Sequence, residues 1–91
     1  MYKLSGQLAQ ENARQAVDAG IAALTAGASD FDLSGLERVD SAAVAVMIAW
    51  QRYALQEKKL LKFHAAPPAL QSLIALYGLS GQFQMVAAER H

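Results

Sequence analysis

Strand-like and helix-like segments alternate along the whole chain, and this order restricts the fold more than any other feature of the sequence. Alternating or continuously apolar residues predict strands at 2–8, 29–33, 60–65 and 82–87. Helical patterns predict helices at 11–26 and 41–57, and a third that begins at Pro67-Pro68 and ends at Gly78. Such an order is typical of an α/β domain with a mostly parallel, four-stranded sheet and helices packed against it. The length of 91 residues suits one domain over 1–91.

The connection between the second strand and the second helix is rich in polar residues. Gly35 predicts a tight turn, which Asp32 and Ser34 are suited to support. Asp40 and Ser41 begin the helix, where unpaired backbone N–H groups favour a capping side chain or a negative charge. Turn and capping chemistry alone explains these residues. The functional alternative is that Ser41 is exposed at the helix tip as a phosphorylation or docking point.

The helix predicted at 41–57 is apolar on two stripes, although a helix on a sheet usually buries one. The stripe that we expect to face the core consists of Val44, Ile48 and Leu55. The second stripe consists of Ala43, Val46, Met47, Trp50 and Tyr53. Because Trp and Met are enriched at interaction surfaces, the second stripe predicts a partner interface. A single wide core stripe remains the alternative.

Composition and charge argue against several classes of function. The chain has eight basic and eight acidic residues, and the scattered basic ones form no patch for nucleic acid. With no cysteine, it has no thiolate nucleophile and no thiolate metal site. The longest apolar run, 42–50, is too short to cross a bilayer, so we expect a cytoplasmic protein without a membrane span.

Residues for catalysis are scarce. Only His64 and His91 could act as bases near neutral pH, and His64 is better explained as a hydrogen-bonded residue within a strand. No cluster of metal-ligating residues and no phosphate-binding glycine pattern is present in the sequence. We therefore expect a protein that is not an enzyme and uses no cofactor.

Five segments carry a family resemblance. Residues 32–41 read Asp-Leu-Ser, a few residues, then an apolar residue and Asp-Ser. Residues 4–8, 52–54, 60–63 and 73–79 add an early strand, part of the second helix, a later apolar strand and a late helix. Together they resemble the STAS domain family, which includes anti-sigma factor antagonists. The resemblance covers nearly the whole chain and implies a small STAS-like α/β fold.

Within that family, the sequence around Asp40 and at the end of the third helix is most similar to MlaB-type members. The resemblance implies a cytoplasmic subunit that binds the ATPase of an ABC transporter for phospholipid trafficking and is peripheral to the inner membrane through that partner. The partner surface implied by resemblance and pattern together consists of Asp40, Ser41, Ala43, Met47, Trp50 and Tyr77.

Ser41 also supports a different function. It falls on the position that is phosphorylated in anti-sigma factor antagonists and is commonly Thr in MlaB-type members. The competing hypothesis is therefore a phospho-switch at Ser41. Ala43 stands where the family often has Gly, and we expect its methyl group to limit the approach of a partner backbone.

The resemblance also implies one strand fewer before residue 2 than family members usually have. Residues 2–8 are then expected at an open edge of the sheet, where homo-association could occur.

Overall fold

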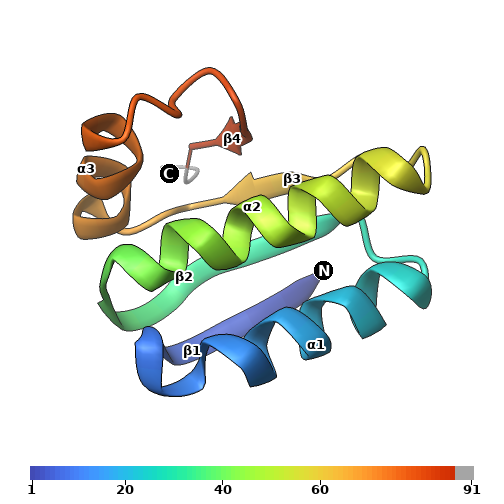
Figure 1. Ribbon diagram of the computed structural model, residues 1–91, viewed down its shortest axis with the longest axis horizontal. Coiled ribbons are helices and arrows are strands. Elements are labelled where there is room, and N and C mark those ends of the chain that lie inside the picture. Colours follow the sequence, from blue (N-terminus) through green and yellow to red (C-terminus); the bar gives the residue numbers. More distant parts are fainter. Residues whose placement is uncertain (88–91) are drawn as a thin grey trace, which may run out of the picture.

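Four parallel strands, three α-helices and one short 3-10 helix make up the fold of the computed structural model, which describes residues 1–87; His91 lies outside them. In spatial order the strands are β1 (Tyr2–Leu8), β2 (Asp30–Val39), β3 (Lys62–His64) and β4 (Gln84–Val86). The helices are the short 3-10 helix η1 (Gln10–Asn12), α1 (Ala13–Thr25), α2 (Ser41–Gln56) and α3 (Pro68–Leu76). The α/β class and the parallel four-stranded sheet are confirmed (Figure 1).

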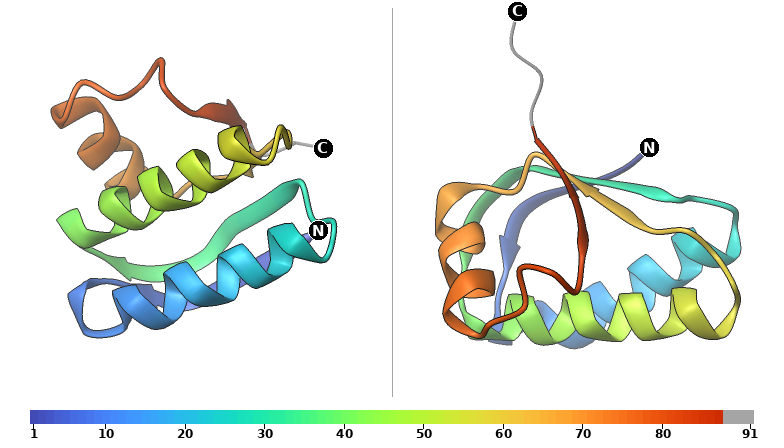
Figure 2. Two further views of the ribbon diagram at one scale, coloured as in Figure 1. Left: turned by 45° about the vertical axis from the view of Figure 1, so that its right-hand side comes forward. Right: turned by 90° about the horizontal axis from the view of Figure 1, so that it is seen from above.

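The helices are distributed unevenly over the sheet. α1 and α2 lie side by side on one face, and α3 lies beside the first half of α2 (Figures 1 and 2). Within residues 1–87 no helix covers the other face (Figure 2). The alternation along β2 matches this arrangement, because Phe31 and Leu33 are buried under the helices while Asp30 and Asp32 are half exposed.

The turn predicted at Gly35 is wrong. β2 continues through Gly35 to Val39, and the pairing of β1 with β2 is irregular between Lys3 and Ser5. A Cβ at position 35 would lie 2.6 Å from the carbonyl oxygen of Leu4. Glycine is therefore needed here because the backbone of β1 comes too close for any side chain.

The sequence assigns the two stripes of α2 only partly to the correct sides. Val44 is buried in the core, as expected. Ala43, Met47 and Trp50 are fully buried, so the expected exposed stripe is part of the core. Leu55, expected in the core, is 66% exposed. The reason is that α2 packs against α1 and also meets the sheet, where Trp50 contacts Phe31, so a wider arc is buried than one contact would bury.

Trp50 joins the two large helices. Its indole Nε1 donates to the carbonyl oxygens of Ala16 (3.1 Å) and Val17 (3.2 Å) in α1. A Cβ on Gly20 would overlap the indole ring, so the absence of a side chain there makes room for it. Phe31 meets Trp50 edge to face, with ring centroids 5.1 Å apart. The tryptophan thus fixes α1 and α2 to each other and to the sheet.

The edges of the sheet follow from the strand order. Among residues 1–87, β1 pairs with β2 alone, so its other side is an open edge there, as predicted for residues 2–8. None of the helices in residues 1–87 has the length and apolar character needed to cross a membrane.

Candidate functional site

Asp40 holds the start of α2 in place. Its Oδ1 accepts a hydrogen bond from the Ala42 N–H (2.8 Å), which caps the helix, and its Oδ2 accepts one from the Gln10 N–H (3.2 Å). One carboxylate therefore satisfies backbone donors of both α2 and η1. Because each oxygen binds a backbone N–H, Asp40 fixes the start of α2 against η1.

A surface ion pair holds the same end of the molecule. The Arg38 guanidinium lies 2.6 Å from a carboxylate oxygen of Glu11 and donates to the Gln7 side-chain oxygen (2.9 Å). Arg38 lies near the end of β2, two residues before Asp40, while Gln7 and Glu11 belong to β1 and η1. The connection that presents Ser41 is therefore fastened to two other elements.

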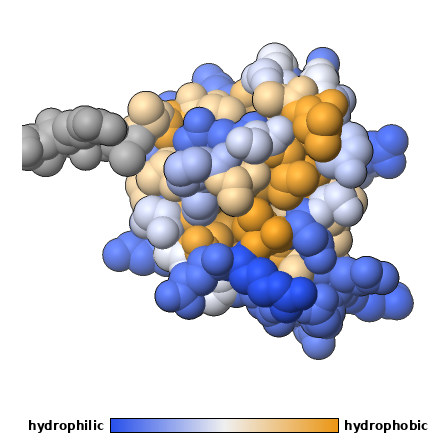
Figure 3. Space-filling view, turned by 90° about the vertical axis from the view of Figure 1, so that its left-hand side faces the viewer, coloured by the Kyte–Doolittle hydropathy of each residue, from blue (hydrophilic) through white to orange (hydrophobic). Residues whose placement is uncertain are grey.

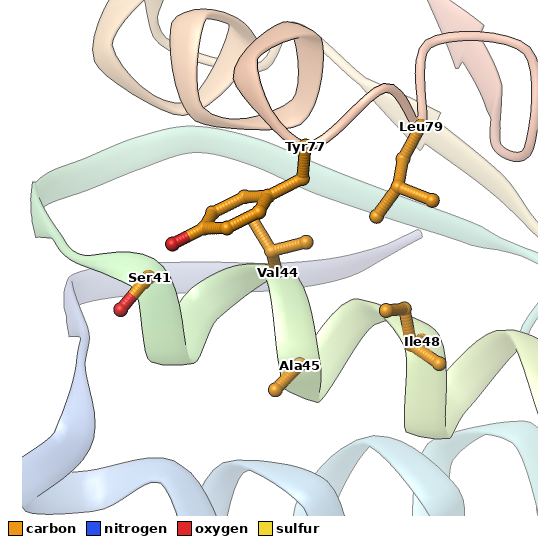
Figure 4. A pocket seen from close by; sticks show the side chains of 6 residues that line it. All are labelled: Ser41, Val44, Ala45, Ile48, Tyr77 and Leu79. Atoms are coloured by element: carbon orange, nitrogen blue, oxygen red, sulfur yellow. The ribbon is translucent and has the colours of Figure 1, made fainter.

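Ser41 is exposed at the first position of α2 and borders an apolar groove of about 410 Å³. The groove lies between α2 and the end of α3, and it is lined by Ser41, Val44, Ala45, Ile48, Tyr77 and Leu79. Figure 4 shows Tyr77 reaching across the first turn of α2 with its hydroxyl toward the Ser41 end. Tyr77 is 52% exposed, so its ring offers a large surface to a partner.

A second hollow of about 250 Å³ continues this groove along α2. The two hollows share Ile48 and Leu79, and the second adds Gln51, Arg52, Leu55, Gln82 and Phe83. We call the combined feature the α2 groove. On the side of the molecule that carries α3 and the start of α2, hydrophobic residues gather into one area bordered by hydrophilic ones (Figure 3). Such an area is typical of an interaction surface.

The structure brings together only part of the interface predicted from the sequence. Ser41 and Tyr77 meet at one end of the α2 groove, and Asp40 lies behind them. The other predicted members, Ala43, Met47 and Trp50, face the interior. Ala43 lies on the buried side of α2, so the expectation that its methyl group limits a partner's approach is also wrong.

The sequence interpretation missed the groove residues Ala45, Ile48 and Leu79. Their signal was present as the spacing of Ser41, Ala45, Ile48, Arg52 and Leu55, which follow one another at three or four residues. Periodicity shows that such residues share a face of the helix. It does not show whether another element covers that face.

Asp32 and Ser34 do not support the start of α2. Asp32 Oδ1 accepts a hydrogen bond from the Ser34 N–H (2.9 Å), but both residues lie within β2 where its pairing with β1 shifts. Asp32 precedes Val39 by seven strand residues, or about 23 Å. Asp32 is therefore far from Ser41, and the turn that Asp32 and Ser34 were expected to support is part of β2. The hydrogen bond from Ser34 lowers the pKa of the Asp32 carboxyl below its usual value.

A second polar pair lies on the same uncovered face. His64 Nε2 is 2.7 Å from Asp30 Oδ1, so His64 is a hydrogen-bonded strand residue, as predicted. This hydrogen bond, with a second from Ser29, lowers the pKa of Asp30. In the described part of the chain, no three His, Cys, Asp or Glu side chains are grouped to hold a metal ion.

The parallel sheet with helices on one face and a capped helix that presents a serine define a small α/β domain. The sequence matches the family described as "Mlab, STAS domain" over residues 2–87, and the chain belongs to this family. Comparison with curated proteins gives no significant match.

Two solved structures share the fold. A protein of Thermotoga maritima described as an anti-sigma factor antagonist has a TM-score of 0.80 at 16% identity, covering 96% of this chain and 78% of that one. The anti-sigma factor antagonist SpoIIAA in its unphosphorylated form has a TM-score of 0.65, also at 16% identity, with 98% and 77% covered. Domains of this kind typically serve regulation or interaction.

Proposed function

We propose that this chain is a non-enzymatic STAS subunit that binds the ATPase of an ABC transporter for phospholipid trafficking through the α2 groove. The observation that carries the proposal is the meeting of Ser41 and Tyr77 at one end of an apolar groove. The description of the family as Mlab agrees with it. The same proposal assigns the chain to the cytoplasm, peripheral to the inner membrane through its partner, where it supports outer-membrane lipid asymmetry.

The mechanism that we propose is stabilisation of the assembled ATPase. A groove held by an N-cap, an ion pair and a buried tryptophan is ordered before the partner arrives. Binding to an ordered surface loses less conformational entropy than binding to a mobile one. The subunit would thereby favour one shape of the ATPase without taking part in its chemistry.

Affinity capture from the native lysate, with mass spectrometry, tests this function. The wild-type chain is expected to capture an ABC ATPase together with its permease. Ser41→Arg and Ala45→Glu place bulk and charge in the groove and should lose at least about nine-tenths of the captured ATPase. Ala22→Glu makes the same change as Ala45→Glu at an exposed position of α1 and should capture normally.

Two results would overturn the proposal. Normal capture by both groove variants would mean that the partner binds elsewhere. Capture of a serine kinase or a sigma-factor regulator in place of the ATPase would point to another class of protein.

The competing candidate is a phospho-switch at Ser41, favoured by the exposure of Ser41 at a helix N-terminus and by the likeness to anti-sigma factor antagonists. A phosphoryl group would add a charge of about −2 beside Asp40 and expel a partner from the groove. Incubation with lysate and ATP, followed by intact-mass measurement, tests it, with Ser41→Ala as control. Stoichiometric modification at Ser41 would favour the switch over the transporter subunit.

A further inference from the structure

We propose that the α2 groove receives one amphipathic helix of the partner protein and that this helix places a carboxylate side chain against Arg52. The inference rests on the proposed function only in requiring that the chain binds a protein. It specifies the chemistry of the partner segment.

The dimensions of the groove fit a helix. It runs along α2 from Ser41 to Leu55, which is about 21 Å at the helical rise per residue. Its opposite wall is the end of α3 and the chain that follows, including Leu79 and Phe83. An elongated apolar groove between a helix and a second wall is the shape that binds the apolar face of an amphipathic helix of about 14 residues.

The charge of the groove specifies the partner further. Among residues 1–87, Arg52 is the one charged residue that lines the α2 groove, and it makes no ion pair there. An exposed guanidinium beside apolar surface is matched by a carboxylate, which it binds through two parallel N–H bonds. A partner helix with an Asp or Glu at its Arg52 end would supply that group.

The side-chain amide of Gln51, next to Arg52, has an unsatisfied hydrogen-bond acceptor. Its side-chain oxygen Oε1 is shielded from solvent and has no hydrogen-bond partner among the described residues. A shielded acceptor without a donor is unfavourable, and rotation of this amide toward a polar donor on the partner would satisfy it. The wall of the groove at Gln51 thus contains a shielded acceptor that a donor on the partner would satisfy.

The helix α1 of a second copy does not fit the groove. The occupant must present an exposed apolar stripe with an acidic residue, and none of the large hydrophobic side chains exposed within residues 1–87 lies on α1. A lipid surface is not favoured either, because among the residues that line the groove Arg52 is the single cation that could meet anionic headgroups. A helix from a different protein is the occupant that satisfies both the shape and the charge.

Site-directed cross-linking in the native lysate tests the inference. The sequence contains no cysteine, so Ala45→Cys and Ala22→Cys each give a unique attachment point for a photoactivatable cross-linker. Ala45 borders the groove, and Ala22 is the control on α1. Mass spectrometry of the cross-linked peptides identifies the partner segment. Thermal unfolding checks that each variant is folded.

We expect Ala45→Cys to cross-link to one segment with apolar residues at every third or fourth position and an Asp or Glu near one end. Adding Arg52→Glu should lower the yield about tenfold, while Arg14→Glu should leave it unchanged. Such a segment in a protein other than an ABC ATPase would support the inference and overturn the proposed function.

Several results would overturn the inference. These are equal yields from positions 45 and 22, a cross-link to a second copy or to lipid, a segment without a carboxylate, and a yield that Arg52→Glu does not change. None of these results decides the proposed function, because the capture experiment tests it separately.

Discussion

At Trp50, the indole N–H lies within hydrogen-bonding distance of two carbonyl oxygens of α1. Tryptophan can be fully buried only where its polar N–H finds an acceptor. Here α1 supplies the acceptors, and Gly20 supplies the space for the ring. A residue type that is common at interfaces is therefore used inside the molecule because a neighbouring helix satisfies its one polar atom.

Gly20→Ala is expected to destabilise the protein by about 2 kcal/mol, because the added methyl group would overlap the Trp50 indole. At an unhindered helix position the same change would stabilise by about 1 kcal/mol. Urea unfolding measures the difference. Gly81→Ala, where an added Cβ meets nothing within 4 Å, is the control with little expected effect. An increase in stability for Gly20→Ala would contradict the packing described.

Trp50→Phe separates stability from binding. Loss of the indole N–H and of ring volume should lower the free energy of unfolding by about 2 kcal/mol. Capture of the partner should remain normal wherever the variant is folded, because Trp50 is fully buried. Loss of capture by a folded Trp50→Phe protein would mean that Trp50 contributes to partner binding.

At the scale of single elements, the start of α2 depends on two hydrogen bonds to Asp40. Asp40→Ala removes both and should cost about 1 to 2 kcal/mol of stability, whereas Asp40→Ser keeps a capping oxygen and should cost less. Thermal unfolding of the two variants gives the comparison. Equal losses would mean that the bond to Gln10, and not the cap, holds this end of the helix.

β1 depends on the missing side chain at Gly35. Gly35→Ala would place a Cβ against the Leu4 carbonyl, so we expect β1 to shift and its backbone amides to exchange hydrogen faster. The global stability should fall by about 2 kcal/mol. Glu37→Ala, at an exposed position of the same strand, is the control. Unchanged exchange in β1 would show that the strand can move without loss of pairing.

At the scale of the whole molecule, two carboxylates make stability depend on pH. The pKa values of Asp30 and Asp32 are lowered from 3.8 in the folded state by hydrogen bonds from His64 and Ser34. A carboxyl with a lowered folded-state pKa stabilises the fold fully above its unfolded pKa, and this contribution disappears as the pH falls through the folded value. Stability should therefore decline from about pH 5 downward.

Urea unfolding across this pH range measures the decline. Asp30→Asn with Asp32→Asn removes both titrating groups, so the loss of stability toward low pH should be shallower than in the wild type. An identical slope in the two proteins would assign the acid sensitivity to other carboxylates.

Homo-association through the open edge of β1 stays a prediction at this scale. An unpaired strand edge can add a strand from a second copy. Sedimentation velocity over a wide range of concentration should then show a dimer that Ser5→Pro abolishes, since proline removes a backbone donor and obstructs pairing. A monomer at every concentration would exclude this association.

Local patterns predicted the secondary structure well because their causes are local. The bounds of β1, the start of α2 at Ser41 and the proline start of α3 follow from alternation, capping and the missing proline N–H. The extent of β2 was underestimated, because Gly35 is the residue of a turn and equally of a close strand contact. Only the position of Leu4 distinguishes the two.

The sequence by itself determined the order of elements, the parallel α/β class, the family and the placement of Ser41 at a helix start. The tertiary structure decided which side of α2 is free, because burial depends on what packs against a face and not on the residues of that face alone. α1 and the sheet cover Ala43, Met47 and Trp50, and they leave Ala45, Arg52 and Leu55 along the groove. Periodicity fixes the faces of a helix, but contacts between elements distant in sequence assign each face to the core or to a partner.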